Sequence, residues 1–207
     1  MYSNFANNTA NHDGGALYCG GLFAVILNSA FSYDEAYDGA GIYLDVAAAI
    51  NYCTFNMENA IHDGGAIYLY ASNTNISTSN PYYDRLVQYA GVRHSLITNC
   101  MAGHDGGAGY VYGNHGIVQN LTMINNTAGN NGGAGYVVGN YGRLLDSTFI
   151  NNIAGNDGGA LLWEGVNGTI NNITVINNKA TNNGGGISLD AASSNGTISI
   201  ANATFVY

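Results

Sequence analysis

The chain has 207 residues, of which 46% are hydrophobic and only 8% are charged, and its formal net charge is −9. Nucleic acids and anionic membrane surfaces bind proteins through clustered cations, and Lys and Arg together number only four here, so neither partner is expected. No segment approaches the ~20 apolar residues of a membrane-spanning helix, and three cysteines without a CxxC spacing, Cys19, Cys53 and Cys100, do not indicate a disulfide framework.

A repeated unit, roughly F-x-N-N-x-A-x-x-D-G-G-A-x-Y, runs along the chain. The Asp or Asn before the glycines recurs in steps of 25 or 26 residues, with one step of 42, at Asp13, Asp38, Asp63, Asp105, Asn131, Asp157 and Asn183. A large apolar column keeps the same register at Phe5, Phe31, Phe55, Ile97, Met123, Phe149, Val175 and Phe205. An alanine column does so at Ala10, Ala36, Ala60, Ala102, Ala128, Ala154 and Ala180. Several columns in one register indicate the coils of a solenoid.

Apolar residues alternate with a period of two within each copy, and Gly and Asn separate the short apolar pieces. This pattern predicts short strands, each pairing with its counterpart one coil away at ~4.8 Å. The sequence therefore predicts an all-β, right-handed parallel β-helix of about seven coils, forming a single domain over residues 1–207.

A tyrosine column follows each glycine pair in the first five copies, at Tyr18, Tyr43, Tyr68, Tyr110 and Tyr136. The columns on either side of it are apolar, so strict alternation points the tyrosines outward, and Tyr70 and Tyr112 lie two residues further along on the same face. Exposed aromatic rings in a row could stack on sugar rings or on a neighbouring rod. The alternative is that they only shield the sheet and stabilise cross-strand contacts.

The step of 42 residues carries 16 extra residues, which we interpret as a loop of about 72–92 protruding from a regular coil. Tyr82, Tyr83 and Arg85 lie in this loop and are candidate contact residues, because insertions in repeat proteins often occupy the working face.

The acidic column offers weak calcium candidates in Asp13, Asp38 and Asp63, since Ca²⁺ prefers oxygen ligands. Asn131 and Asn183 replace Asp in two coils, which favours capping of an Asx-turn by these side chains. His12, His62 and His104 each precede an Asp of this column, and His62 and His104 are expected on adjacent coils. They are either a transition-metal pair or residues at a tolerant turn position.

Eight sequons provide glycosylation candidates for an exported chain: Asn7, Asn75, Asn120, Asn125, Asn167, Asn172, Asn195 and Asn202.

Neither end of the sequence has the pattern of a cap, because Phe5 opens a repeat at once and Thr204-Phe205 repeats Thr148-Phe149. Two hypotheses follow: a segment of a longer surface protein, or subunits that stack head to tail into a filament.

Two segments carry a family resemblance: Phe5-Ala6-Asn7-Asn8-Thr9-Ala10 with Asp13-Gly14-Gly15-Ala16, and Asn151-Asn152-Ile153-Ala154 with Asp157-Gly158-Gly159-Ala160. They resemble the repeats of the adhesin-like proteins of methanogenic archaea and of the polymorphic outer membrane proteins of chlamydiae. The resemblance implies an extracellular, cell-surface β-helix with a structural or adhesive role and no cofactor. Its expected partners are copies of itself or cell-surface glycans and proteins.

The alternative function is a carbohydrate-active β-helix enzyme resembling polysaccharide lyases or hydrolases. It would use Asp84 and Arg85 in the insertion, with Arg93 and His94 beside it. No acid–base pair stands out from the repeat columns, so the sequence favours a non-enzymatic protein.

Overall fold

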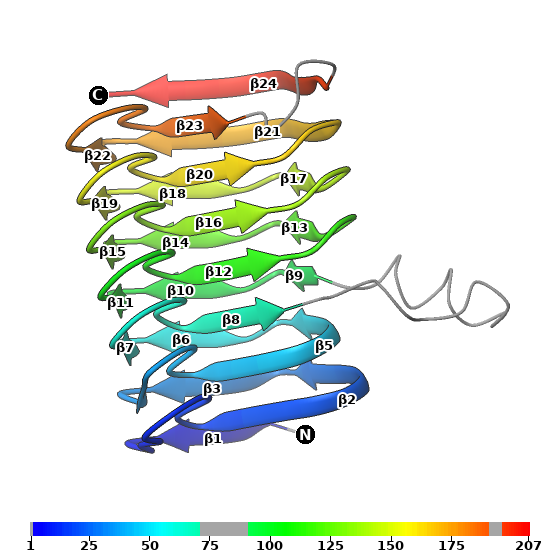
Figure 1. Ribbon diagram of the computed structural model, residues 1–207, viewed down its shortest axis with the longest axis vertical. Helices are drawn as coiled ribbons and strands as arrows, with labels where there is room; N and C mark the ends of the chain where they lie inside the picture. Colours follow the sequence, from blue (N-terminus) through cyan, green and yellow to red (C-terminus); the bar gives the residue numbers. More distant parts are fainter. Residues whose placement is uncertain (1, 71–90, 191–195) are drawn as a thin grey trace, which may run out of the picture.

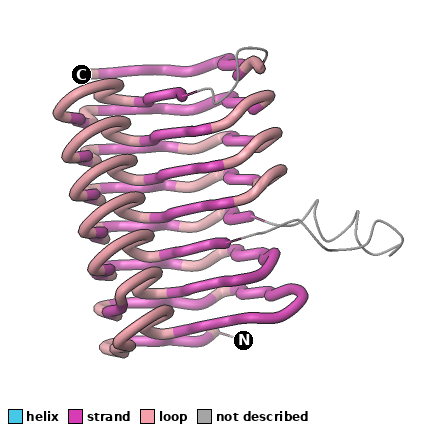
Figure 2. Tube along the Cα trace, viewed as in Figure 1, coloured by secondary structure: helices cyan, strands magenta, loops and turns pink. Residues whose placement is uncertain are grey.

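The computed structural model describes residues 2–70, 91–190 and 196–207. These residues form one right-handed solenoid of stacked parallel strands (Figure 1). No described residue lies in a helix, and the turns that connect the strands stack above one another in the same way as the strands do (Figure 2). The predicted fold class, a right-handed parallel β-helix, is confirmed.

Each coil contributes to three ribbons of strands. The front ribbon faces the viewer in Figure 1 and contains β2 (Leu17–Leu27), β5 (Ile42–Asn51), β8 (Ile67–Tyr70), β12 (Gly109–Tyr112), β16 (Gly135–Val138), β20 (Leu161–Glu164) and β23 (Ile187–Asp190). The edge ribbon consists of two-residue strands, namely β4 (Glu35–Ala36), β7 (Asn59–Ala60), β11 (Met101–Ala102), β15 (Thr127–Ala128), β19 (Ile153–Ala154) and β22 (Lys179–Ala180).

The rear ribbon completes the coil. It contains β1 (Ser3–Ala6), β3 (Ser29–Ser32), β6 (Thr54–Asn56), β10 (Leu96–Thr98), β14 (Thr122–Ile124), β18 (Thr148–Ile150), β21 (Gly168–Ile176) and β24 (Ile198–Val206). Three short strands lead into it, namely β9 (Gly91–Arg93), β13 (Ile117–Gln119) and β17 (Arg143–Leu145).

The register follows the repeat columns. Phe5 pairs with Phe31, Phe31 with Phe55, and the apolar column continues in this way to Phe205. The rings of Phe31 and Phe55 stack inside the solenoid with centroids 4.8 Å apart. The alanine column pairs along the edge ribbon from Ala36 to Ala180. Because each buried side chain repeats one coil away, the core is a set of parallel stacks.

Turn chemistry explains the abundance of Asn and Gly. Many turn positions have a positive φ, which Asn tolerates better than most residues, as at Asn125 (φ 57°) and Asn151 (φ 55°). Gly107 meets a different demand, because a Cβ built there would lie 2.5 Å from the carbonyl carbon of Thr127 on the next coil. The paired-glycine motif therefore allows coils to approach closely at this corner.

The insertion ends earlier than the sequence predicts. Residues Gly91–Arg93 form β9, which pairs with Ala49–Asn51 in β5 and with Ile117–Gln119 in β13. Residues 91 and 92 thus belong to the coil and not to the predicted loop. The loop candidates Tyr82, Tyr83 and Arg85 lie outside the described residues, as do two of the eight sequon asparagines, Asn75 and Asn195.

A cavity of about 60 Å³ lies inside the solenoid beneath β12 and β16. It forms where Gly109 and Gly135 occupy an inward position that is filled by Ile67 one coil before and Leu161 one coil after. The buried Trp163 lines the same space and donates its indole N–H to the Gly139 carbonyl at 2.9 Å. All three cysteines are free, and Cys53 and Cys100 are buried.

Candidate functional site

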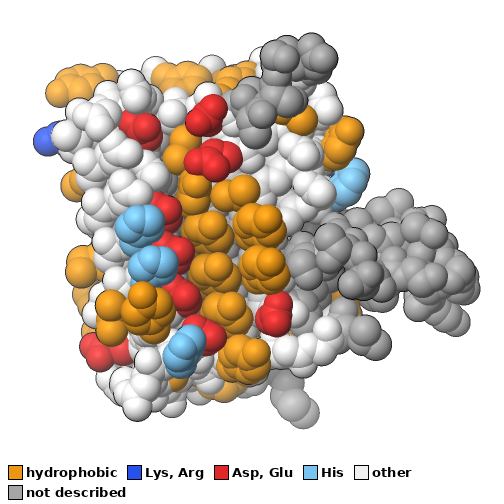
Figure 3. All heavy atoms as spheres, in the orientation of Figure 1, with side chains coloured by type: hydrophobic (Ala, Val, Ile, Leu, Met, Phe, Trp, Pro, Cys, Tyr) orange, Lys and Arg blue, Asp and Glu red, His pale blue; other side chains and the backbone are white. Residues whose placement is uncertain are grey.

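Six tyrosines form an outward-facing surface on the front ribbon, which we call the tyrosine face: Tyr18, Tyr43, Tyr68, Tyr110, Tyr70 and Tyr112. Their columns stand side by side at the centre of Figure 3. The rings of Tyr43 and Tyr68 stack with centroids 4.7 Å apart, those of Tyr68 and Tyr110 at 4.9 Å, and those of Tyr70 and Tyr112 at 5.0 Å. The predicted outward direction and register are confirmed for these six residues.

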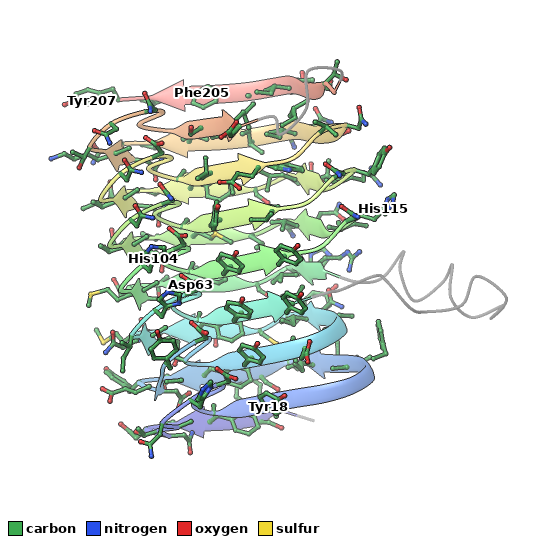
Figure 4. All side chains as sticks on the ribbon, in the orientation of Figure 1. Tyr18, Asp63, His104, His115, Phe205 and Tyr207 are labelled. Carbon is green, nitrogen blue, oxygen red and sulfur yellow. The ribbon has the colours of Figure 1, made fainter. Side chains whose placement is uncertain are left out.

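Stacking along the solenoid axis decides which part of each ring a partner meets. The interplanar angles are 7° for Tyr43–Tyr68 and 9° for Tyr70–Tyr112, so each ring covers the face of its neighbour (Figure 4). A sugar ring that stacks on an aromatic residue needs access to the ring face. The tyrosine face presents ring edges and hydroxyl groups instead, which favours contacts with a protein over stacking on sugars.

Tyr136 continues the column but is not accessible. Its side chain is only 8% exposed, its ring meets that of Tyr110 edge-on at 66°, and its hydroxyl donates to Glu164 Oε1 at 2.6 Å. Burial and this hydrogen bond raise the pKa of Tyr136 above its usual range. The predicted contact surface needs an accessible ring, and Tyr136 does not present one.

Acidic groups surround the tyrosine face (Figure 3). Asp38, Asp63 and Asp105 lie in the turns that precede the tyrosine-bearing strands, Asp45 lies on the tyrosine-bearing strand β5, and Glu164 lies on β20, the next strand of the front ribbon after β16. The described cations, Arg93, Arg143 and Lys179, lie on the other ribbons, in β9, β17 and β22.

The phenol groups of Tyr43, Tyr68 and Tyr110 remain protonated near neutral pH. Burial, followed by the Asp13 and Asp45 carboxylates, raises the pKa of Tyr43 to about 12. Burial is also the main cause that raises the pKa of Tyr68 and of Tyr110. The hydroxyls are therefore neutral hydrogen-bond donors in a negative environment.

The acidic column forms a hydrogen-bond ladder that runs between coils. Asp38 Oδ1 accepts the backbone N–H of Asp63 at 2.9 Å, and Asp63 Oδ1 accepts that of Asp105 at 3.0 Å. The same bonds continue from Asp105 to Asn131, from there to Asp157, and on to Asn183. The sequence predicts capping within one turn, whereas the acceptor reaches the next coil, because the coil spacing brings that N–H within range. Calcium binding by Asp13, Asp38 and Asp63 stays a prediction.

The histidines before this column take part in the same ladder. His62 Nδ1 lies 3.2 Å from Asp38 Oδ1, and His104 Nδ1 lies 3.3 Å from Asp63 Oδ1. Asn130, one coil further, places its Nδ2 at 2.9 Å from Asp105 Oδ1 in the equivalent bond. His and Asn therefore serve as interchangeable side-chain donors to the preceding coil. His62 and His104 lie on adjacent coils as predicted, with their rings stacked at 5.0 Å.

A buried ladder of amides lines the corner between the rear and edge ribbons, and our reading of the sequence missed it. Asn152 is fully buried, its Oδ1 accepts both the backbone N–H and the Nδ2 of Asn126 at 3.0 Å, and its Nδ2 donates to the Met123 carbonyl at 3.0 Å. The column comprises Asn8, Asp34, Glu58, Cys100, Asn126, Asn152 and Asn178. The signal was present in the sequence, since each of these residues stands two positions before the alanine column.

Two carboxyl groups replace amides in this buried column. Asp34 and Glu58 are 0% and 1% exposed, and Glu58 Oε2 accepts the backbone N–H of Asp34 at 3.0 Å. Asp34 Oδ2 and Glu58 Oε1 have no hydrogen-bond partner in the part of the chain that the structure describes. Burial, and then the neighbouring Asp34 carboxyl, raise the pKa of Glu58 to about 8.

The described sequon asparagines share one backbone feature. All six are exposed and have φ between 49° and 58°: Asn7, Asn120, Asn125, Asn167, Asn172 and Asn202. The left-handed turn accounts for Asn at these positions whether or not a glycan is attached. Glycosylation of these residues stays a prediction.

Comparison with known proteins supports part of the resemblance. Three segments, residues 2–20, 146–162 and 172–190, match the Chlamydia polymorphic membrane protein repeat. No curated protein matches the chain, and no solved structure matches it. Within the described part of the chain, no helix has the length and apolar character needed to cross a membrane. The resemblance to archaeal adhesin-like proteins is not supported, and the chain is similar, over these three segments, to the chlamydial repeat.

Proposed function

We propose that the protein is a cell-surface adhesive β-helix that contacts a protein partner through the tyrosine face. The observation that carries this proposal is the stacked double row of partly exposed tyrosines on a rigid ribbon. Tyrosine is enriched at the centres of protein interfaces, because it combines a large apolar area with a hydroxyl group. The three matches to a chlamydial membrane-protein repeat support a location at the cell surface.

The chemistry of the face favours a particular kind of partner. Its ring edges and hydroxyls suit contacts with apolar side chains and backbone groups, and its acidic surroundings suit Lys or Arg at the rim of the partner surface. Tyr43 and Tyr68 at the centre of the stack have both ring faces covered by neighbouring tyrosine rings, so a glycan cannot stack on them. A basic protein surface therefore fits the tyrosine face better than a polysaccharide does.

Adhesion of beads coated with the purified chain to cultured cells tests the proposal. The variant Tyr68→Ser/Tyr110→Ser removes two adjacent rings of the stack, and we expect it to lower adhesion strongly. Tyr2→Ser is the matched control, because Tyr2 is 69% exposed but lies outside the tyrosine face. Circular dichroism checks that each variant is folded. Equal adhesion by the double variant and the unmodified chain would refute the role of the tyrosine face. Binding of the unmodified chain to a glycan array that the double variant loses would identify sugars, and not a protein, as the partner.

End-to-end association of coils is a second proposal. Phe205 in β24 is 54% exposed, whereas its counterpart Phe149 in β18 is 1% exposed. A further coil placed against β24 would bury Phe205, whether that coil belongs to the same polypeptide or to a second copy. Electron microscopy of the purified chain distinguishes the two, since rods of variable length indicate stacking of copies and particles of one length do not.

The alternative of a carbohydrate-active enzyme stays a prediction, because Asp84 and Arg85, which it would use in the insertion, lie outside the described residues. The neighbouring carboxyl groups with the most favourable chemistry for acid–base work, Asp34 and Glu58, are sealed inside the wall of the solenoid. A polysaccharide cannot reach them. Reducing-sugar and lyase assays over a panel of polysaccharides test this alternative directly.

A further inference from the structure

Two imidazoles converge on one carboxylate at the edge of the solenoid. His62 Nδ1 lies 3.2 Å from Asp63 Oδ2, and His104 Nδ1 lies 3.3 Å from Asp63 Oδ1. Figure 4 shows Asp63 and His104 together at the turn that follows the edge ribbon. We propose that His62, Asp63 and His104 form a binding site for a divalent transition metal of the Zn²⁺ type. This proposal is independent of the tyrosine face.

The distances between the ligand atoms suit a tetrahedral ion. One nitrogen from each imidazole and a carboxylate oxygen of Asp63 all lie within 4.8 Å of one another. Zn²⁺ binds imidazole nitrogen and carboxylate oxygen at about 2.0–2.1 Å, so ligand atoms around a tetrahedral ion stand roughly 3.4 Å apart. The short N···O contacts, His62 Nδ1 with Asp63 Oδ2 at 3.2 Å and His104 Nδ1 with Asp63 Oδ1 at 3.3 Å, are already near this value and use the two different oxygens of the carboxylate. The ligand atoms that stand further apart must approach one another by at most roughly 1.4 Å on the same bond lengths.

The two imidazoles are exposed enough to move toward a metal ion, while the Asp63 carboxylate is held in place. The imidazoles of His62 and His104 are 41% and 49% exposed, so they can tilt toward each other without disturbing the core. Their rings are stacked at an interplanar angle of 4°, and the Nδ1 atoms of both lie within 3.3 Å of an Asp63 carboxylate oxygen. Asp63 is held in place from the next coil by the backbone N–H of Asp105, which its Oδ1 accepts at 3.0 Å.

The charge around the site favours a dication. Asp38 Oδ1 lies 3.2 Å from His62 Nδ1, and Asp105 Oδ2 lies 3.1 Å from His104 Nδ1, so three carboxylates line the two rings. Either outer carboxylate or a water molecule can supply the fourth ligand. Metal binding requires the Nδ1 lone pair, so each imidazole must carry its proton on Nε2, and for His104 this replaces the contact that Asn130 Nδ2 makes with Nε2 at 3.4 Å.

The rest of the chain supplies internal controls. Among the described residues, His12 pairs with its own Asp13 alone, at 3.0 Å, and its neighbour one coil away is Tyr37. One coil beyond His104, Asn130 makes the same ladder bond without a metal-binding nitrogen. A His→Asn substitution at this column therefore removes a metal ligand and keeps the bond that joins the coils.

Calorimetric titration of the full chain with ZnCl₂ and with NiCl₂ at pH 7.5 tests the site. We expect one ion per chain, with the affinity lowered at least about tenfold in His62→Asn and in His104→Asn and abolished in the double variant. His12→Asn should bind as the unmodified chain does. Zn²⁺ should also raise the melting temperature of the unmodified chain and leave that of the double variant unchanged.

Two results would overturn the proposal. The first is the absence of both a binding heat and a thermal shift for the unmodified chain with either metal. The second is equal affinity in the double variant, which would assign binding to the carboxylates alone. A titration with CaCl₂ separates that second case, because a carboxylate site would respond to calcium and an imidazole site would not.

Discussion

Replacing Gly109 with alanine should stabilise the protein, although glycine substitutions in repeat turns usually do the opposite. Gly109 lies in β12 at a position that faces the internal cavity. A Cβ built there would meet the Ile67 carbonyl oxygen at 3.6 Å and the Ile67 Cβ at 4.0 Å, which are ordinary van der Waals distances. The φ of Gly109 is not in the left-handed region, so alanine adopts this backbone without strain.

The size of the effect follows from two contributions. Burying one methyl group contributes about 0.8 kcal/mol, and the reduced freedom of the unfolded chain contributes about 0.4–1 kcal/mol. Their sum is a gain of about 1–2 kcal/mol, or a few degrees in melting temperature for a chain of this size. Gly107→Ala is the matched control in the preceding turn, where the new Cβ would lie 2.5 Å from the Thr127 carbonyl carbon. The Thr127 backbone is held by its pairing between coils and cannot shift without cost, so we expect the free energy of unfolding to fall by about 3 kcal/mol.

Scanning calorimetry and thermal circular dichroism of the two variants and the unmodified chain measure both effects under the same conditions. The expected order of melting temperatures is Gly109→Ala above the unmodified chain, and Gly107→Ala well below it. A Gly109→Ala variant that melts as low as Gly107→Ala would refute the reasoning, because it would mean that no space exists beneath β12.

Three further predictions concern buried groups and their hydrogen bonds. The pKa of Glu58 is raised to about 8 from an ordinary value of 4.5, so the folded chain retains a proton that the unfolded chain loses. The stability contributed by this protonated group is fully present below about pH 4.5 and falls toward pH 8 by up to about 1.4 kcal/mol per pH unit. Glu58→Gln should flatten this profile in melting temperatures measured from pH 4 to 9, and parallel profiles would contradict it. Asn152→Ala should cost about 2–4 kcal/mol in urea unfolding, because it leaves buried partners of the amide ladder unsatisfied. Tyr136→Phe should cost about 1–2 kcal/mol by removing the bond to Glu164, and an unchanged urea midpoint would show that this bond contributes nothing.

The sequence was sufficient for the fold because the repeat spacing is itself structural information. Residues one coil apart in sequence stack directly above one another, so the spacing of a column such as Phe5, Phe31 and Phe55 predicts which residues pair between adjacent strands. Even the long insertion did not disturb this logic, since Phe55 still pairs with Ile97 on the next coil. Alternation along the strand also gave the outward direction of the tyrosines, because side chains of a strand point to opposite faces.

The candidate sites depended on more than spacing. The outward direction of Tyr136 could be predicted, but its burial depends on a hydroxyl bond to Glu164 two residues along the next coil. The sequence predicted that Asp63 caps a backbone N–H within its own turn. In the structure its Oδ1 accepts the backbone N–H of Asp105 on the next coil, because adjacent coils are close enough for a direct hydrogen bond. The convergence of His62 and His104 on Asp63 required the ring orientations as well as the register.

The sequence by itself therefore determined the right-handed β-helix, the pairing of its columns and the face that carries the tyrosines. Only the tertiary structure decided which ring faces are covered, which carboxyl groups are sealed inside the wall, and where the core is left incomplete. The physical reason is that a repeat specifies which residues are neighbours. The orientation and burial of a side chain depend on how its neighbours on both adjacent coils fill the space around it.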